Sequence, residues 1–582
     1  MVLKKYDQDQ SKFICFNPKS NIPEGHIAFL VDEIVEGLDF GEINGKYEGT
    51  PGAHAYNRKI ALKIDIMGVV DSIFSSRKIC EQLMYNDVYK YLAGNEIIDH
   101  RTLCRSRKEN EDLYKKALLS TIIIGIERKM ITLEHIGLDG TLYKANASIK
   151  NLFTAENLKV VDEIIAKRLS FDEEDELFYQ KDTYEIVEKD YFNAIDEILK
   201  DDLIENTINE VKTEKEKENH GEKVEKTIEM RDLKKEKNNH KRISNKIKKT
   251  AQKILKGDKK TIEKKKKVEE KLEESIQEKV NMTDPDSFAA YNKKKCFESL
   301  YNIGYACDYD SKMILANIVG DTPTDANQFI PLLEELIETI GIENINTISA
   351  DSIYNNSKNL IYAEKQGINA LIPSKFQAST SKDDTYKEKN QFHKHNFIYN
   401  HEKDCYICPM DIELPFKNEY KDGKRVYYTN ECKNCIEKDK CKKKSGTRII
   451  TAYKGEQAIQ RMKIKMEKPE NQKEYKKRAP AVESPIGDIK HNNHMREFKT
   501  RGNEKVLIEA NKGSISHNLR LILSNIKKQK KELEKVDQSI TKQHNLSYKI
   551  CQKIKSFFKF PQKTGLFISI QFFQRKIQIS KT

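Results

Sequence analysis

The stretch LEHIGLDGTLYKANAS (residues 133–148) decides how the chain is interpreted. Its first half is apolar and reaches Asp139, a glycine follows, and a polar run leads on to Lys144, Asn146 and Ser148. This pattern predicts a buried strand that carries an acid near its end. Because a carboxylate in that position is costly unless something compensates its charge, Asp139 is a candidate functional residue.

A second acid has the same setting. Asp351 follows the short apolar segment NTISA and precedes a polar turn. In α/β sheets, ligand sites form at the carboxyl ends of strands. Two carboxylates that meet there repel each other unless a cation or a proton lies between them, and a pair of hard divalent cations removes the repulsion. Two such metals, about 3.5–4 Å apart, can promote phosphodiester cleavage.

The third candidate acid is Glu483, in the stretch YKKRAPAVESPIGDIKHNNHMREFKTRG. A proline two residues later is tolerated in the first turn of a helix, so we expect Glu483 at or just inside a helix N-terminus. Lys490 lies seven residues on, two turns away on the same face. Tyr475 and Arg478 lie upstream. An acid between these cations could hold metal while the cations hold DNA phosphate.

The segments around the acids differ in composition and in hydrophobic pattern. Residues 26–115 predict compact helices that end in a basic patch, which suits a DNA-binding domain, although a plain helical bundle fits the pattern equally well. The patch contains Arg101, Arg105, Arg107 and Lys108. From about residue 298, strands alternate with helices, which indicates an α/β core. Two strands are expected within 300–320, joined by a turn at Asp308–Ser311.

The segment 155–282 is dominated by Lys and Glu. Sparse apolar residues recur in it at helical spacing, which predicts a helical hairpin or coiled coil with a charged exterior and no assigned chemistry. The apolar positions are Ile243, Ile247, Ala251, Ile254, Val268, Leu272, Ile276 and Val280.

The composition favours a polyanionic partner. Of the 582 residues, 34% are charged, against about 25% in an ordinary globular domain, and the net charge is +13. Such a basic surplus suggests nucleic acid, with a Lys-rich solvated surface as the alternative. No apolar run is long enough to cross a bilayer, and the N-terminus lacks the core of a signal peptide. We therefore expect no membrane partner and a cytoplasmic, nucleoid-associated protein with reduced cysteines.

Taken together, these motifs resemble a known family, the DDE transposases of bacterial insertion sequences, and within the IS4-like class the IS1182 group. The segments IPEGHIAFLVDEIVEGLDF and FSSRKICEQLMYNDVYKYLAGNEIIDHRTLCRSR resemble its helical domain, LDGTLYKANAS its first-Asp motif, ADSIYNN its second-Asp motif, and RAPAVESPIGDIK with FKTRG its Glu motif. Tyr475, Arg478, Glu483 and Lys490 also fit the Tyr-Arg-Glu-Lys signature of the class.

The resemblance implies a ribonuclease-H-like α/β catalytic core, split by a charged helical insertion and a Cys-bearing insertion, behind an all-helical DNA-binding domain. The expected boundaries are 1–120 for the N-terminal domain; 128–152, 295–375 and 470–530 for the core; 153–290 for the charged, coiled-coil-like insertion; 376–465 for the Cys-bearing insertion; and 531–582 for a basic tail.

The resemblance also implies a function. The protein would bind the inverted repeats of its element as a homodimer, cut the DNA ends and join the 3′ hydroxyls to target DNA. Asp139, Asp351 and Glu483 would bind two Mg²⁺ ions, for which Mn²⁺ could substitute. Arg478 and Lys490 would hold phosphate, Tyr475 would pack against the DNA backbone, and Arg101 and Arg105 would contact DNA from the N-terminal domain.

Five cysteines cluster in the second insertion. Cys432 and Cys435, with Cys441, have the spacing of zinc ligands, and a fourth thiolate would complete a tetrahedral site. We choose Cys408 because it precedes a proline, as in the Cys-Pro motif of the family, with Cys405 as the alternative. The zinc would be structural. Reduced cysteines without a metal are the other explanation.

Three other interpretations of the chain remain. The first is a metal-dependent nuclease of the same fold that cuts DNA and never joins it. The second is an inactive or domesticated DNA-binding protein. The third, a coiled-coil protein with a zinc module, leaves the ordered set of three acids unexplained.

Overall fold

The computed structural model describes residues 17–45, 56–174, 242–243, 245–274, 278–292, 295–380, 391–421, 423–441, 447–453 and 455–557. The chain forms two compact units, Met1–Leu519 and Arg520–Thr582, and each is described by itself. The predictions for 175–241, for Ile276 and for 558–582 lie outside the described residues. None of the described helices is both long enough and apolar enough to cross a membrane.

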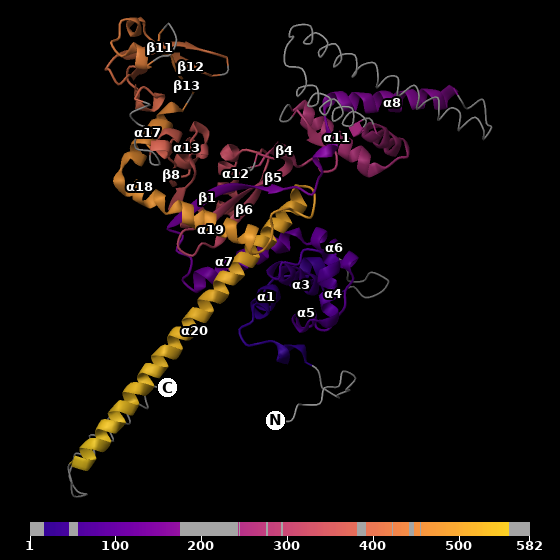
Figure 1. Cartoon of the computed structure of the whole chain (residues 1–582), viewed down its shortest axis with the longest axis vertical. Helices are drawn as coiled ribbons and strands as arrows, with labels where there is room; N and C mark the ends of the chain where they lie inside the picture. Colours follow the sequence, from indigo (N-terminus) through magenta and orange to yellow (C-terminus); the bar gives the residue numbers. More distant parts are fainter. Residues whose placement is uncertain are drawn as a thin grey trace, which may run out of the picture. The chain divides into compact units, whose positions relative to one another are not determined.

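The N-terminal part is helical, as the apolar spacing predicts (Figure 1). Polar side chains define where its helices begin: Asn86 accepts from the Val88 N–H at 3.0 Å, and Asp99 accepts from the Thr102 N–H at 2.7 Å. The third helix is buried along most of its length and packs against the first and the sixth. The helices are α1 (Ile27–Glu36), α2 (Gly41–Gly45), α3 (Arg58–Val70), α4 (Ser76–Tyr85), α5 (Asp87–Leu92), α6 (His100–Glu109) and α7 (Glu111–Glu127).

A buried cluster of charges links these helices to the start of α20 (Asn503–Phe557). Asp65 of α3 is fully buried, and Lys512 Nζ lies 3.1 Å from its Oδ2. Arg107 donates to the same carboxylate, and the Tyr114 hydroxyl donates to Oδ2 at 2.6 Å. The prediction that Arg107 belongs to an exposed basic patch is therefore wrong, because a buried carboxylate on α3 draws its side chain inward.

The central sheet contains β1 (His135–Lys144), the strand predicted from the opening stretch, between two different neighbours. It pairs antiparallel with β5 (Phe297–Asp308) and parallel with β7 (Thr347–Ser349). Beyond these, β6 (Ile314–Gly320) and β4 (Phe288–Tyr291) both pair antiparallel with β5, and β8 (Asn369–Leu371) pairs parallel with β7. The strand order is therefore β6-β5-β1-β7-β8, and β5 is antiparallel to the other strands. The short strand β4 pairs with the beginning of β5, on the same side as β6.

Helices cover both faces of this sheet (Figure 1). A Cβ at Gly137 would meet Val482 of α19 (Arg478–His491), whereas one at Gly304 would lie 3.4 Å from Leu332 of α12 (Phe329–Ile340). Because side chains alternate along a strand and Gly304 pairs with Gly140, these two helices lie on opposite faces. Further along the chain come α13 (Ser357–Lys365), α14 (Lys375–Thr380), α17 (Glu456–Glu467) and α18 (Pro469–Lys476).

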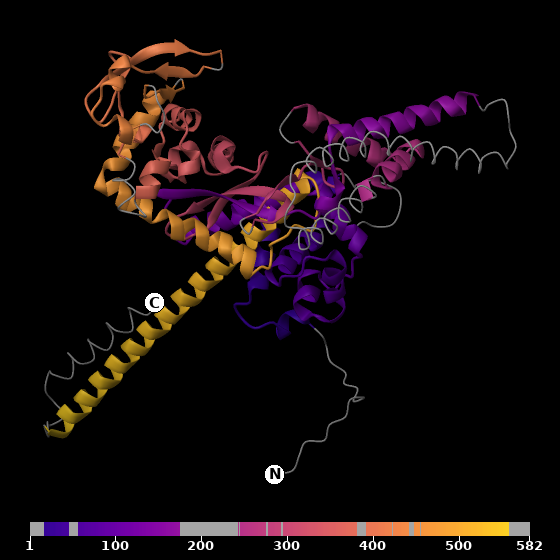
Figure 2. The same ribbon diagram turned by 45° about the horizontal axis from the view of Figure 1, so that its top comes forward.

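A second sheet is entirely antiparallel and lies in the Cys-bearing segment, drawn in orange in Figure 2. Its strands are β9 (Ile398–Asn400), β10 (Cys405–Ile407), β11 (Glu413–Glu419), β12 (Arg425–Tyr427) and β13 (Ile450–Ala452). It has a core of its own, in which Phe397, Tyr406 and Tyr427 are almost completely buried. A short helix, α16 (Lys438–Cys441), precedes the last strand.

The charged segment contributes α8 (Ala155–Glu174), a helix over 245–255, α11 (Lys259–Glu273) and the small pair β2 (Leu152–Phe153) and β3 (Val280–Asn281). Ile247, Ala251 and Val268 of the predicted seam are buried against α8, and Ile243, Ile254 and Leu272 pack against them. Val280 lies in β3 rather than in a helix.

Candidate active site

Asp139 lies half-buried within β1, on the face that α19 covers. Arg478 is the first residue of α19, and its Nη2 donates to Asp139 Oδ1 at 2.9 Å. The same guanidinium donates twice to the Leu138 carbonyl, at 2.9 and 3.2 Å. Only 7% of Arg478 is exposed. The start of α19 is thereby fixed to the strand that carries the acid.

Asp351 lies two residues beyond the end of the neighbouring strand β7, level with Asp139 of β1. Gly137 of β1 pairs with Ser349 of β7 in parallel register, and each acid lies two residues beyond its paired residue. Asp351 also accepts a hydrogen bond from the Ser352 N–H, at the start of a short 3₁₀ helix, Ser352–Tyr354. The prediction that Asp139 ends its strand is wrong, because β1 continues in register with β5 as far as Lys144. The register with β7 still brings the two acids close together.

The electrostatics of Asp139 reflect this crowding. Burial raises the pKa of Asp139 above its ordinary value, and the charges of Asp325 and Asp351 raise it further. The charge of Arg478 opposes these effects but does not outweigh them. Carboxylates that repel one another in this way have a high affinity for a cation placed between them.

Asp325 is an acid that the sequence analysis missed. Its Oδ1 accepts from Asn302 Nδ2 at 2.7 Å, and a Cβ on Gly140 would lie only 2.2 Å from that oxygen. The signal was available, because Asp325 follows β6, which runs in the same direction as β1 and so ends at the same edge of the sheet. The strand-end rule that predicted the position of Asp351 applies to this strand as well.

Tyr475 lies beside the same acids. It is half-buried at the end of α18, and burial raises the pKa of its hydroxyl. Arg478, Asp351 and Asp139 are the charges close enough to act on that hydroxyl. The structure thus brings together four of the predicted residues: Asp139, Asp351, Tyr475 and Arg478.

Glu483 and Lys490 are placed differently. Because α19 begins at Arg478, Glu483 is the sixth residue of the helix and Pro485 lies inside it, so the predicted position at a helix N-terminus is wrong. Glu483 is exposed. Lys490 Nζ donates to Thr141 Oγ1 at 2.6 Å and to the Leu142 carbonyl at 2.9 Å. Across the part of the chain that the structure describes, no three His, Cys, Asp or Glu side chains lie close enough to hold a metal ion as they stand.

Arg101 and Arg105 are both exposed on α6, four residues apart and hence on one side of the helix. This position leaves them accessible from solvent.

Two segments of the chain match known families. Residues 16–109 match a family described as a transposase domain, and residues 407–523 match the transposase DDE domain. These matches support a DDE transposase of insertion sequences. No curated protein and no solved structure matches it significantly.

The two matched segments contain only part of the candidate site of this transposase. The DDE-domain match contains Tyr475, Arg478, Glu483 and Lys490, together with β11, β12 and β13 of the second sheet. Asp139 and Asp351 lie between the two matched segments, so their assignment depends on the sheet geometry described above.

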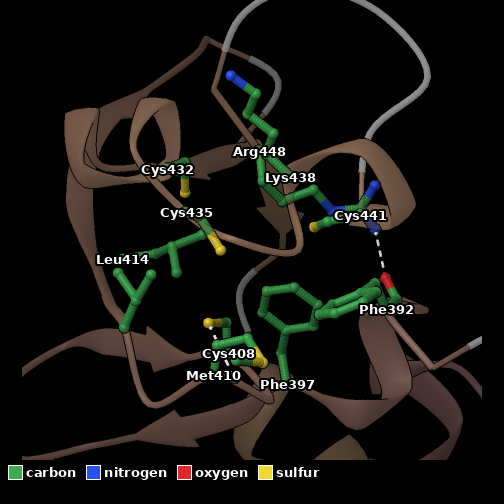
Figure 3. Close-up of a pocket in the computed structure, with 11 residues that line it drawn as sticks. Phe392, Phe397, Cys408, Met410, Leu414, Cys432, Cys435, Lys438, Cys441 and Arg448 are labelled. Atoms are coloured by element: carbon green, nitrogen blue, oxygen red, sulfur yellow. Dashed lines mark hydrogen bonds between the residues drawn. The ribbon is translucent and has the colours of Figure 1, made fainter.

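Four of the five clustered cysteines of the transposase line one cavity of about 20 Å³, the room of a single water-sized body (Figure 3). They are Cys408, Cys432, Cys435 and Cys441. Burial raises the pKa of Cys441; Arg448 opposes the rise, and the other three cysteines add to it. Cys405 is buried elsewhere on β10 and does not line the cavity.

A backbone N–H that can donate a hydrogen bond to a thiolate also lies at this cavity. The Met410 N–H lies 3.3 Å from Cys408 Sγ, in the turn between β10 and β11. Arg448 borders the cavity, with its Nη2 donating to the Phe392 carbonyl at 3.0 Å, while its Nε is buried without a hydrogen-bond partner among the described residues.

Proposed function

We propose that this transposase binds the terminal inverted repeats of its element, cleaves the phosphodiester bonds at the ends and joins the 3′ ends to target DNA. The observation that carries the proposal is the parallel register of β1 and β7, which brings Asp139 within β1 level with Asp351, two residues beyond the end of β7. We also propose a ribonuclease-H-like core, and the mixed strand order, with β5 antiparallel beside β1, supports this proposal.

Asp139, Asp351 and Glu483 would hold two Mg²⁺ ions, with Mn²⁺ able to substitute. The donor set fits, because carboxylate oxygens are the ligands that these hard cations prefer. When bound, the ions would activate the attacking oxygen and stabilise the leaving oxygen of the phosphodiester.

Glu483 is two turns before Lys490 and on the same side of α19. Lys490 already reaches Thr141 and Leu142 of β1 from that side. Glu483 therefore shares the helix face from which Lys490 contacts β1, which supports its place in the proposed donor set.

The remaining residues position DNA. Arg478 keeps Asp139 oriented and presents positive charge to the phosphate at the cut, and Tyr475 packs against the backbone next to it. Lys490 offers a second cation once it exchanges its β1 acceptors for phosphate. Such contacts hold DNA without reading its sequence, so recognition of the ends falls to the N-terminal helices, including Arg101 and Arg105.

We further propose membership of the IS1182 group, action as a homodimer that cuts both ends together, and association with the nucleoid. The resemblance of the motifs to those of that group supports the first, and the need to synapse two ends supports the second. The basic net charge of +13 supports the third.

The decisive experiment is cleavage and strand transfer on labelled DNA that carries the inverted repeats flanking the gene, with Mg²⁺. Asp139→Asn, Asp351→Asn and Glu483→Gln should each abolish cutting and keep DNA binding. Asp321→Asn, an exposed acid close to the site in sequence, is the matched control and should cut normally. Cutting without joining would establish a nuclease instead, and binding without any cutting would establish an inactive DNA-binding protein.

We also propose a structural Zn²⁺ held by Cys408, Cys432, Cys435 and Cys441. Four thiolates around one small cavity are the ligand set of structural zinc sites. A zinc ion with four thiolates carries a net negative charge, which the adjacent Lys438 and Arg448 would offset. The thiols would draw closer on binding, since they are not yet within ligand distance of one point.

Zinc content of the purified full-length protein tests this site. We expect about one zinc per chain, lost in Cys408→Ser and retained in Cys405→Ser, which changes the cysteine three residues earlier on β10. Cobalt in place of zinc should give the absorption of a tetrahedral thiolate site. Equal zinc content in the two variants would exclude the proposed ligand set.

A further inference from the structure

The charged insertion contains a cavity of about 400 Å³ lined by cations. It lies between the helix over 245–255, α11 and the segment that enters α20. The cations of this basic pocket are Lys246, Lys249, Lys253, Lys264 and Arg501. The sequence analysis assigned no chemistry to this segment, so the pocket requires a separate explanation.

The packing of the helix determines which lysines face the pocket. Ile247 and Ala251 are completely buried in the apolar core of the insertion. Lys246, Lys249 and Lys253 recur at intervals of three and four residues and therefore share another face of the same helix. Because the apolar face of the helix is buried in the core, its lysine face directs the three cations toward the cavity in one row.

Two lysines of α11 outside the pocket form ion pairs, whereas Asp258 acts on Lys253, and Asp284 on Lys264 and Arg501, only through longer-range electrostatics. On α11, Lys265 pairs with Asp162 at 2.7 Å, and Lys271 pairs with Asp286 at 3.3 Å. In the described ranges, no ion pair joins any pocket cation to a carboxylate. Lys264 Nζ instead donates to the Thr283 carbonyl, and Arg501 Nε donates to the Asn146 carbonyl at 2.7 Å.

The cations repel one another as a result. Burial lowers the pKa of Lys246, and the charge of Lys150 lowers it further. Burial and Arg501 lower the pKa of Lys264. The charge of Asp284 opposes this only in part, and its carboxylate already accepts from the Tyr301 hydroxyl at 2.8 Å. Like charges that nearby acids offset only in part destabilise the fold, and a bound anion would remove that cost.

We propose that the basic pocket binds the phosphate backbone of the DNA that flanks the cut. The row from Lys246 to Lys253 extends over about 10 Å at 1.5 Å per residue, which is too long for one phosphate and matches about three phosphate steps of one DNA strand. A free phosphate ion or a single nucleotide would leave part of the row unneutralised. The inference rests on the proposed function, because it takes the polyanion to be the DNA substrate.

The position relative to the acids fits the same duplex. Arg501 binds the carbonyl of Asn146, which lies seven residues beyond Asp139 in the direction of β1. At about 3.3 Å per residue, the pocket is roughly 20 Å from Asp139, or about six base pairs along a duplex. DNA held at the acids therefore reaches the pocket within about half a helical turn.

The test measures the affinity of the full chain for a labelled duplex of arbitrary sequence at several salt concentrations, without divalent metal. Each phosphate contact contributes about one to the slope of log affinity against log salt. Lys249→Gln with Lys253→Gln, both exposed, should lower the slope by about two. Lys266→Gln with Lys267→Gln changes two exposed lysines of α11 outside the pocket and should leave the slope unchanged.

A second variant separates binding from a structural role. Lys246→Gln removes repulsion at a partly buried site, so the melting temperature should rise or stay constant while the salt slope falls. A lower melting temperature with an unchanged slope would mean that the lysine serves the fold, and the proposal would be overturned. Equal slopes for the two double variants would overturn it as well.

Two further outcomes are distinct. If inorganic phosphate raises the melting temperature of the wild type but not of the Lys249→Gln, Lys253→Gln variant, and the duplex slope is unaffected, the pocket takes a small anion and the DNA assignment is wrong. If the wild type binds the duplex but does not cut it, the proposed function is wrong. The salt slopes of the variants still decide whether the basic pocket binds DNA.

Discussion

Arg478 Nη2 donates to Asp139 Oδ1 at 2.9 Å, although 339 residues separate the two in the chain. The guanidinium also donates to the Leu138 carbonyl through two of its nitrogens. A single side chain therefore orients the acid and fixes the backbone beside it.

This relationship predicts that Arg478→Lys lowers DNA cleavage about 100-fold, the usual cost of losing one preorganised donor. Lysine keeps the charge but lacks the planar fork that serves both acceptors. The measurement is single-turnover cleavage at saturating protein. Lys477→Gln is the control, because this neighbouring cation is exposed and pairs with Glu474. Wild-type rates in Arg478→Lys would refute the role.

Asp325 predicts an effect on metal binding. Its charge adds to the field around Asp139, so Asp325→Asn should weaken Mg²⁺ binding about tenfold, or about 1.4 kcal/mol. The measurement is the rise in melting temperature of the full chain as Mg²⁺ is added. Asp321→Asn serves as the control. An unchanged Mg²⁺ response in Asp325→Asn would show that this acid is too remote to matter.

Gly140→Ala tests the same contact by steric means. The added Cβ would lie 2.2 Å from Asp325 Oδ1, which Asn302 holds in place. Overpacking of this kind costs about 1–3 kcal/mol. Denaturant unfolding should show that loss, and combining Gly140→Ala with Asp325→Ala should recover much of it. If the double variant is no more stable than Gly140→Ala alone, the clash is not with Asp325.

The buried cluster on α3 predicts a large effect on stability. Asp65→Asn leaves Arg107 and Lys512 without their carboxylate, and breaking a buried pair costs about 3–5 kcal/mol. Denaturant unfolding measures the loss. Asp32→Asn is a suitable comparison: Asp32 pairs with Lys63 at 2.6 Å but is partly exposed, so its loss should be smaller. Similar losses in the two variants would contradict the importance of burial.

The same cluster predicts a dependence on pH. Burial would raise the pKa of Asp65, but the charges of Arg107 and Lys512 outweigh it and hold the pKa below its ordinary value of 3.8. A carboxyl with a lower pKa in the folded state stabilises the fold fully above 3.8, and the contribution declines as the pH falls further. The stability difference between wild type and Asp65→Asn should therefore be constant near neutral pH and shrink below 3.8. A difference that does not shrink would mean that Asp65 is not ionised.

Local pattern was sufficient to predict the strand of Asp139, its parallel neighbour and the helices of the N-terminal part, because periodicity and turn residues act over short distances. It was also sufficient to select Asp139, Asp351, Tyr475 and Arg478 together as candidate site residues.

What local pattern could not provide was the partner of a buried charge. Arg107 has the sequence context of a surface cation, and only the packing of α3 against α6 reveals the carboxylate that it binds. The predicted position of Glu483 was wrong for a related reason. Proline favours the first turn of a helix, but apolar contacts of Val482, Ile486 and Ile489 with the sheet extend α19 on both sides of Pro485.

The distance in sequence between Arg478 and Asp139 has a consequence for synthesis. The ribosome releases the N-terminal helices and the strand of Asp139 long before it makes α19, and Lys512, the partner of Asp65, emerges later still. A chain that stops early would carry helices with exposed arginines but no arginine beside Asp139. If the N-terminal helices recognise the ends of the element as proposed, such a product would occupy those ends without cutting them, and premature termination would then produce an inhibitor of transposition.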